Sequence, residues 1–296
     1  MSQDSQTIVL KDKRTLGYAE WGNPNGKPVF FISGSNNARF FRHPDETILR
    51  ELDICLYTFD RPGMGLSDFQ AGRTLLDWAD DMRDFATQKA INRFAMMGVS
   101  GGAPYVAACA CAISDLLTSA TLVSGVSPMS PQMLQTLSFP TRMITFLAQR
   151  MVGLLTLQNN LLGFFVKHGD GETLLRRSLS MLPASDQQII AQPDVAQILV
   201  TDVLESIRQG GKGSALDMHV FTAKDWGFKL EDIKTKVFIW QGEDDPQATP
   251  AMAKYMSERI PNNEVTFVPD AGHFLILGHW REILKQLLAH WGNDEM

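Results

Sequence analysis

Short apolar runs alternate with helix-like patterns along most of this chain of 296 residues. Residues 28–34 and 53–60 are continuous runs of apolar, β-favouring residues, which is typical of strands covered on both faces. Residues 74–90 instead place apolar side chains at helical spacing and acidic side chains on the opposite face. Repeated strand–helix–strand units of this kind predict an α/β fold: a mostly parallel, twisted sheet with helices on both faces.

The same patterns predict the remaining elements. An opening pair of strands is expected at 6–12 and 15–22, and a helix at 40–52. Further strands are predicted at 93–99, 120–126, 236–242 and 264–270, and further helices directly after Ser100, at 250–260 and at 279–291.

The alternation stops near Pro128, and helical patterns rich in Leu, Met and Phe follow as far as about residue 218. No convincing strand pattern occurs in this stretch. We therefore predict a core in two parts, 1–128 and 219–296, with a helical cap at 129–218 inserted between two strands of one sheet.

Charge and composition exclude several classes of protein. The net charge of −6 offers no basic field for nucleic acid. The most apolar stretch, 143–167, is interrupted by polar residues such as Gln149 and Arg150, so stable membrane insertion is not expected. The polar start does not resemble a secretory signal, and the three cysteines show no metal or disulfide pattern, so we expect a cytoplasmic protein without a metal site. The oligomeric state is not indicated.

One serine lies where a buried strand is expected to turn into a helix. Gly98 and Gly102 flank Ser100 two positions away on either side, which is the G-x-S-x-G pattern of a nucleophile elbow. The glycines are required because a Cβ at either position would collide with the neighbouring chain. The turn lifts the serine hydroxyl clear of the sheet and points the first free helix amides toward a developing oxyanion.

A serine nucleophile needs a base and a group that orients the base. Of the six histidines, His273 alone follows a strand immediately, with a glycine before it. The strand before that one ends in three acids, Glu243, Asp244 and Asp245, among which we favour Asp245. The order Ser, Asp, His along the chain is the one expected for this architecture.

The chain resembles the α/β-hydrolases with a helical cap, including esterase and iminopeptidase members, over almost its whole length. The motifs that carry the resemblance are YAEWGNPNGKPVFFISG at 18–34, DRPGMGLSD at 60–68, TLLDWADDM at 74–82, GVSGG at 98–102, WQGEDDP at 240–246 and DAGHF at 270–274.

The resemblance implies a triad of Ser100, Asp245 and His273. It also implies an oxyanion hole made by the backbone amides of Gly101 and Ser35. Relatives usually carry His-Gly in the loop after the third strand, whereas this chain has Ser33-Gly34. The missing histidine usually braces that loop. Asn36, or the hydroxyl of Ser35, is therefore an alternative oxyanion donor.

The predicted cap offers apolar side chains for a substrate pocket over Ser100, next to Gly34 and Asn36 of the core. Most of its apolar surface must pack on the core. The candidates for the pocket wall are Met143, Phe146, Met151, Phe164 and Phe165.

These residues predict a serine hydrolase that cleaves a carboxylic ester of a small to medium, largely apolar substrate, without a cofactor. Relatives that cleave carbon–halogen bonds or epoxides use an aspartate at the elbow, where this chain has Ser100. Three alternatives remain open: an aminopeptidase or amidase of the iminopeptidase type, a carbon–carbon bond hydrolase with the same triad, and a non-catalytic small-molecule receptor. The first needs cap carboxylates to hold an amino group, for which the candidates are Glu172, Asp194, Asp202 and Glu205.

Overall fold

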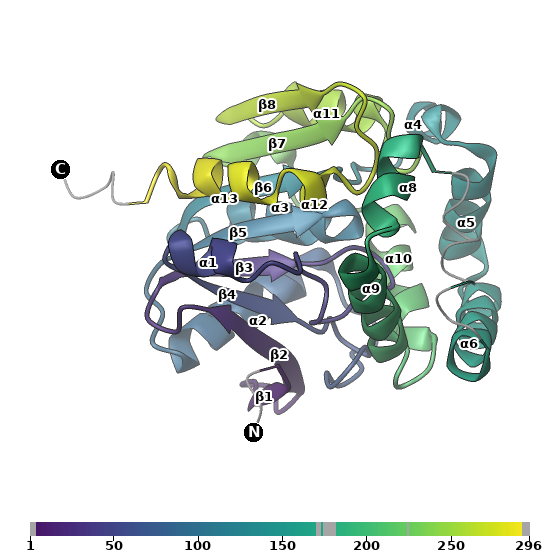
Figure 1. Ribbon diagram of the computed structural model, residues 1–296, viewed down its shortest axis with the longest axis horizontal. Coiled ribbons are helices and arrows are strands. Elements are labelled where there is room, and N and C mark those ends of the chain that lie inside the picture. Colours follow the sequence, from purple (N-terminus) through teal and green to yellow (C-terminus); the bar gives the residue numbers. More distant parts are fainter. Residues whose placement is uncertain (1–3, 170–172, 174–181, 224, 292–296) are drawn as a thin grey trace.

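The computed structural model describes residues 4–169, 173, 182–223 and 225–291. In this part of the chain, eight strands form a single sheet in the order β1-β2-β4-β3-β5-β6-β7-β8 (Figure 1). β2 runs antiparallel to both of its neighbours, and all other adjacent strands run parallel. The predicted α/β class and the mostly parallel sheet are confirmed.

Each of the eight strands overlaps a predicted strand, although β6 begins and ends three residues earlier than the predicted 120–126. They are β1 (Gln6–Val9), β2 (Thr15–Gly22), β3 (Lys27–Ile32), β4 (Ile54–Phe59), β5 (Phe94–Val99), β6 (Leu117–Val123), β7 (Val237–Gly242) and β8 (Asn263–Val268).

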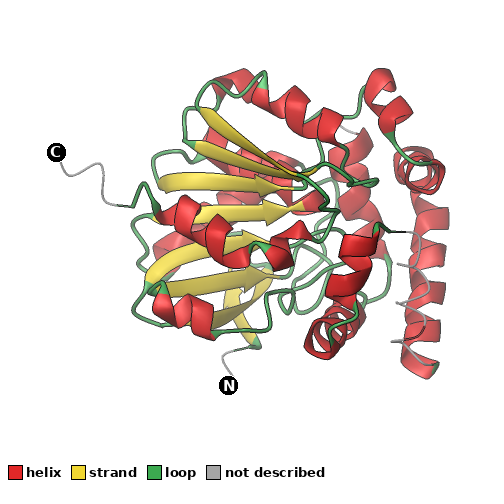
Figure 2. Ribbon diagram, turned by 45° about the horizontal axis from the view of Figure 1, so that its top comes forward, coloured by secondary structure: helices red, strands yellow, loops and turns green. Residues whose placement is uncertain are grey.

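Helices cover both faces of the sheet, as Figure 2 shows. Successive residues of a strand point to opposite faces, so each central strand contributes side chains to the hydrophobic cores on both faces of the sheet. Phe30 of β3 packs with the side chains of α2 and α3, whereas Phe31 packs with those of α1 and α13. Both side chains are completely buried. Continuous apolar runs in the central strands are therefore explained by burial on both sides.

The core helices are α1 (Thr47–Glu51), α2 (Leu75–Gln88), α3 (Ala103–Ala112), α11 (Pro250–Ser257), α12 (Leu275–Gly278) and α13 (Trp280–Leu288). The prediction of a helix over the whole of 40–52 was too long. Pro44 disfavours helical geometry at the residue before it, so the helix begins only at Thr47.

Six described α-helices lie between β6 and β7 in the chain, and we call them the inserted helices. They are α4 (Pro131–Thr136), α5 (Phe139–Arg150), α6 (Val152–His168), α8 (Ala184–Ile190), α9 (Pro193–Ser206) and α10 (Lys212–Ala223). Figure 1 shows them beside the edge of the sheet where the parallel strands end. α10 continues past residue 218, and the division into core and cap at 128 and 218 stays a prediction.

Within the described residues, no helix combines the length and the apolar character needed to cross a bilayer.

Candidate active site

The turn between β5 and α3 has the geometry of a nucleophile elbow. Ser100 adopts a left-handed backbone conformation with φ of 54°, which is strained for a residue with a side chain. A Cβ at Gly98 would lie 2.8 Å from the carbonyl oxygen of Gly102, and a Cβ at Gly102 would lie 2.2 Å from that of Ile32. Only glycine fits at either position, as the spacing of the motif predicts.

An acid–imidazole pair lies at the ends of the last two strands, β7 and β8. Asp245 comes after β7, and its Oδ2 lies 2.8 Å from Nδ1 of His273, which comes after β8. The other carboxylate oxygen of Asp245 accepts hydrogen bonds from the backbone amides of Gln247 and Ala248. Asp245 is buried, whereas the neighbouring acids are exposed to solvent. Of the three acids considered, the structure brings only Asp245 to the histidine.

Two buried carboxylates raise the pKa of His273. Burial by itself lowers the pKa of the imidazole, but the negative charge of Asp245 and its hydrogen bond outweigh that effect, with a further contribution from Asp186. The pKa of His273 therefore ends above its ordinary value. Because Nδ1 is held by Asp245, Nε2 is the nitrogen left for proton transfer.

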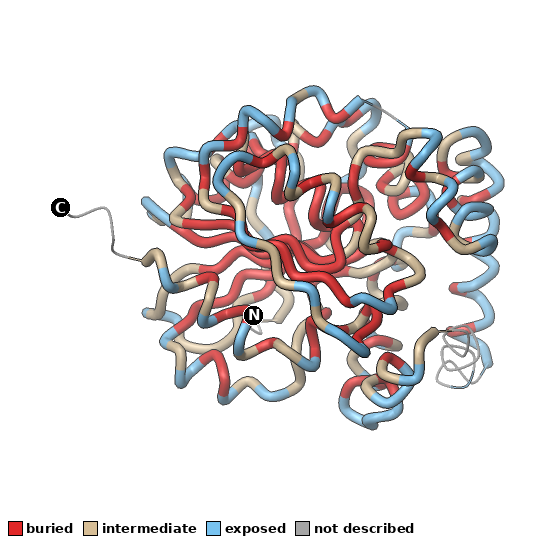
Figure 3. Tube along the Cα trace, turned by 90° about the horizontal axis from the view of Figure 1, so that it is seen from above, coloured by how far each residue is buried: buried red, intermediate tan, exposed pale blue. Residues whose placement is uncertain are grey.

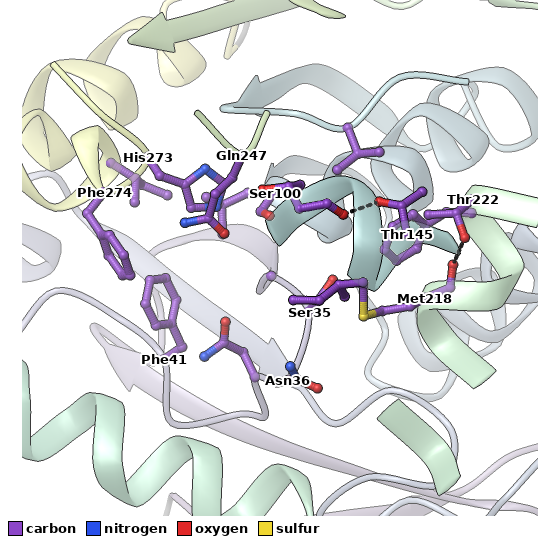
Figure 4. Close-up of a pocket in the computed structure, with 18 of the residues that line it drawn as sticks. Ser35, Asn36, Phe41, Ser100, Thr145, Met218, Thr222, Gln247, His273 and Phe274 are labelled. Carbon is purple, nitrogen blue, oxygen red and sulfur yellow. Dashed lines mark hydrogen bonds between the residues drawn. The ribbon is translucent and has the colours of Figure 1, made fainter. Parts of the chain in front are cut away.

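Ser100 and His273 line the same cavity, which has a volume of about 270 Å³ (Figure 4). The predicted site residues Gly34, Ser35 and Asn36 line it as well. None of the described lining residues is an Asp, Glu, Lys or Arg. Its wall is mostly apolar, with side chains from the core and from the inserted helices: Phe41, Val99, Val126, Met129, Ile144, Leu199, Val203, Met218, Phe221, Phe274 and Ile276.

Two backbone amides beside Ser100 are candidates for an oxyanion hole. Ser35 lies against the elbow, since a Cβ at Gly101 would be 2.4 Å from its Oγ. Within the described part of the chain, the amides of Ser35 and Gly101 make no backbone hydrogen bond. Both are therefore available to an oxygen bound beside Ser100.

A buried arginine, which the sequence analysis did not single out, braces the loop after β3. Arg61 donates hydrogen bonds of 2.6 Å to the carbonyl oxygens of both Ser33 and Gly34. Ser33 itself donates to the carbonyl oxygen of Ala38. Arg61 thus braces the loop after β3, which relatives usually brace with a histidine of the loop itself. Arg61 lies outside this loop, in the DRPGMGLSD motif.

Asp217 of α10 holds Arg61 in turn. Its carboxylate lies 3.0 Å from Nε of Arg61 and 2.9 Å from Nη2 of Arg73, and it also accepts a hydrogen bond from the hydroxyl of Tyr105. Burial and the charge of Asp217 raise the pKa of Tyr105, so this hydroxyl keeps its proton. The sequence does not indicate that Asp217, an acid within a helical pattern, holds an arginine of a distant loop.

Two more buried aspartates of the inserted helices bind core loops at the site. Asp186 of α8 accepts hydrogen bonds of 2.8 Å from the backbone amides of His273 and Phe274. Asp202 of α9 accepts hydrogen bonds from Asn37, Ala38 and Phe40 in the loop after β3. Each carboxylate therefore joins an inserted helix to a loop that lines the cavity.

The predicted apolar wall must be corrected. Met143, Phe146 and Phe164 do not line the cavity, and they are 45%, 50% and 57% exposed, respectively. On α5 the cavity wall is formed by Thr141, Ile144 and Thr145, one turn apart on the other side of the helix. The sequence supplied apolar residues on several sides of these helices and did not indicate which side faces the site. Met151 and Phe165 are exposed as well.

A model of the family described as "alpha/beta hydrolase fold" matches residues 17–279. The chain belongs to the α/β-hydrolase family. The predicted resemblance is thereby confirmed. A search of curated proteins finds no significant match.

Solved structures with the same architecture include α/β-hydrolases of different named activities. An esterase from Rhodococcus sp. ECU1013 is 17% identical, with a TM-score of 0.70 and coverage of 98% of this chain and 100% of the other. An enol-lactonase from Burkholderia xenovorans LB400 is 16% identical, with a TM-score of 0.70 and coverage of 96% and 99%. A bromoperoxidase from Bacillus anthracis is 18% identical, with a TM-score of 0.70 and coverage of 96% and 99%. At these identities the likeness shows the fold alone.

Proposed function

We propose that this α/β-hydrolase cleaves a carboxylic ester of a small to medium, largely apolar substrate through an acyl-enzyme on Ser100. The observation that carries the proposal is the pair of Asp245 and His273, joined at 2.8 Å, on a cavity shared with a serine held at φ of 54°. Esterase and enol-lactonase structures show that this fold accommodates such a reaction in other proteins.

In the proposed reaction, Nε2 of His273 takes the proton of the Ser100 hydroxyl while the serine oxygen attacks the ester carbonyl. The amides of Gly101 and Ser35 stabilise the oxyanion that forms. His273 then donates the proton to the departing alcohol, and the acyl group remains on Ser100. Asp245 orients the imidazole and stabilises its positive charge during each transfer.

Water completes the cycle. His273 removes a proton from a water molecule, which attacks the acyl carbonyl, and then returns that proton to Ser100 as the carboxylic acid leaves. All proton transfers involve groups of this chain, the substrate and water. The scheme uses no metal or organic cofactor.

The cavity supports a neutral, mostly apolar substrate. Its volume of about 270 Å³ suits a small or medium acyl or alcohol group. A charged substrate group would find no Asp, Glu, Lys or Arg among the described lining residues, in which His273 is the one ionisable side chain.

No observation favours the iminopeptidase alternative. Asp202 and Glu205 bind groups of the core, Glu205 through Arg39, and neither lines the cavity. Asp194 is exposed, and Glu172 lies outside the described residues.

The direct test is ester hydrolysis by Ser100→Ala, with Ser257→Ala on α11 as the matched control. We expect Ser100→Ala to lose at least about 10³-fold in turnover, because the nucleophile is gone, and the control to keep wild-type kinetics. A Ser100→Ala protein that hydrolyses esters at the wild-type rate contradicts the proposal. Acyl esters of graded chain length, an amino-acid anilide and a vinylogous diketone then separate ester, amide and carbon–carbon cleavage. Ligand binding without turnover of any substrate would indicate a receptor.

A further inference from the structure

The helix α6 buries Leu155, Asn159, Gly163 and Val166 and leaves most of its large apolar residues exposed. Asn159 is buried against residues 211–214, and Gly163 is buried against Ile207. Leu157, Leu161 and Phe164 are each at least half exposed, at 53%, 50% and 57%. The outer side of a helix at the surface of a soluble protein normally carries mostly polar residues, so the outer side of α6 is unusually apolar.

The exposed apolar surface is concentrated on α6 and its neighbour α5. Of the fourteen large apolar side chains that the described residues leave exposed, eleven lie between positions 139 and 165. Figures 1 and 3 place these two helices at one end of the molecule, on the side away from the sheet. We call this surface the apolar face, and it consists of Phe139, Met143, Ile144, Phe146, Met151, Leu154, Leu157, Leu161, Leu162, Phe164 and Phe165.

The charges on α5 and α6 are all positive. The sequence holds no Asp or Glu between 116 and 169, although the whole chain has a net charge of −6. Arg142, Arg150 and Lys167 are exposed on these helices. An apolar surface with basic residues beside it is the composition of helices that lie in the interface of an anionic membrane.

The basic residues also favour a lipid bilayer over a second copy of the chain as the partner of the apolar face. A two-fold pairing through the apolar face would bring the same basic residues of two copies together, with no acid on α5 or α6 to neutralise them. An anionic lipid surface neutralises them and covers the apolar side chains at the same time.

The apolar face reaches the cavity. Ile144 belongs to the apolar face, at 36% exposed, and it also lines the cavity that holds Ser100. Thr141 and Thr145, on the same side of α5, line the cavity with it. Molecules dissolved in a bilayer at this surface would therefore lie next to the cavity.

We propose that α5 and α6 bind the surface of an anionic lipid bilayer, with the apolar face in the interface and the basic side chains at the headgroups. The binding is peripheral, since no described helix spans a bilayer. If the proposed ester hydrolysis holds, the site takes apolar esters directly from the lipid phase. The vesicle binding itself does not rest on that function.

Flotation of the full chain with vesicles tests the proposal. One set of vesicles contains phosphatidylcholine alone, and the other contains phosphatidylcholine with phosphatidylglycerol. We expect the wild type to bind the anionic vesicles more strongly. Leu157→Gln/Phe164→Gln should weaken that binding about tenfold or more, because two exposed apolar side chains no longer enter the interface. The matched control, Phe69→Gln/Phe267→Gln, replaces two exposed apolar residues outside the apolar face and should bind as the wild type does.

Charge reversal tests whether the basic side chains bind the anionic headgroups. Arg142→Glu/Lys167→Glu should remove the preference for anionic vesicles. Three results would overturn the proposal: no wild-type binding to either vesicle, binding that the Gln pair leaves unchanged, or a wild-type dimer in solution that the Gln pair converts to a monomer.

Hydrolysis of a soluble ester should be unchanged in all of these variants, which shows that they are folded. Ser100→Ala should bind vesicles as the wild type does. A failure of vesicle binding is thereby distinguished from a failure of the proposed hydrolysis.

Discussion

Asn36 occupies a left-handed backbone position, with φ of 58°, on the wall of the cavity. Ser214 of α10 donates a hydrogen bond to its side-chain oxygen. This contact leaves the amide NH₂ group of Asn36 as the free end of the side chain. A single residue thus joins an inserted helix to the loop from which an oxyanion donor is expected.

Asn36→Ala tests whether that NH₂ group contributes to the oxyanion hole. Loss of one oxyanion donor typically lowers turnover about 10²–10³-fold, and we expect a decrease of at least about tenfold here, with little change in KM. The measurement is steady-state ester hydrolysis. Unchanged kinetics would remove Asn36 from the hole and leave it to the amides of Gly101 and Ser35.

The pH dependence of turnover reports on His273. The base acts only when it is neutral, so activity should rise with pH through the pKa of His273, which its carboxylate neighbours hold above the ordinary value. Asp186→Asn removes one of those negative charges, which lowers the pKa. The acid limb of the pH–rate profile should therefore move to lower pH.

The control for this measurement is Asp244→Asn, which removes an exposed charge from the loop of Asp245. It should leave the acid limb in place, because solvent screens the charge. If Asp186→Asn changes only the rate and not the position of the acid limb, Asp186 acts on the loop of His273 through its hydrogen bonds alone.

At the scale of elements, three inserted helices each contribute one fully buried aspartate to a core loop: Asp186 from α8, Asp202 from α9 and Asp217 from α10. A buried carboxylate is costly unless hydrogen bonds compensate it, and each of these has at least two. The arrangement fixes the loops of His273 and Ser35 relative to the helices that cover them. These aspartates are positioning residues, since none of them lines the cavity.

Asp202 should make the stability of the protein depend on pH. Burial raises its pKa to about 7 from an ordinary value of 3.8, in spite of its hydrogen bonds to Ala38, Asn37 and Phe40. Between these values the folded protein keeps a proton that the unfolded chain releases. The contribution of Asp202 to the free energy of unfolding therefore falls as pH rises, in total by an amount on the order of a few kcal/mol.

Chemical denaturation of wild type and Asp202→Asn across that pH range measures this contribution. The difference in unfolding free energy between the two proteins should change steadily with pH between about 4 and about 7. Asp194→Asn, an exposed acid on the same helix, should show no such trend. A wild-type–variant difference that stays constant with pH would contradict the assignment.

The strands could be predicted from the sequence because burial on both faces leaves long apolar runs, as at Phe30 and Phe31. The elbow could be predicted because its steric demands fix glycines at Gly98 and Gly102. The role of Arg61 could not, because its partners are backbone carbonyl oxygens of a distant loop. Hydrogen bonds to backbone atoms leave no pattern in the partner's side chains.

The prediction of the cavity wall from residues of α5 and α6 was wrong for a different reason. Both helices carry Leu, Met and Phe on several sides, so periodicity did not distinguish the side facing the cavity from the side facing outward. Ile144 lines the cavity, whereas the neighbouring Met143 and Phe146 do not. The predicted wall residues belong instead to the apolar face for which we propose a lipid surface.

At the scale of the whole molecule, the sheet gathers the chemistry at one edge. The loops after β3, β5, β7 and β8 supply Ser35, Ser100, Asp245 and His273, and parallel strands place their carboxyl ends together. The inserted helices close this edge and carry the apolar face on their outer side (Figure 1). The proposed membrane surface covers the outer side of these helices and meets the proposed site at Ile144 of α5.

The most direct measurement for the central claim is peptide mapping by mass spectrometry after treatment with a fluorophosphonate. The account predicts a single adduct on Ser100, formed rapidly in the wild type, slowed strongly in His273→Ala and absent in Ser100→Ala. An adduct on a different residue, or continued ester hydrolysis by protein whose Ser100 is fully modified, would contradict it.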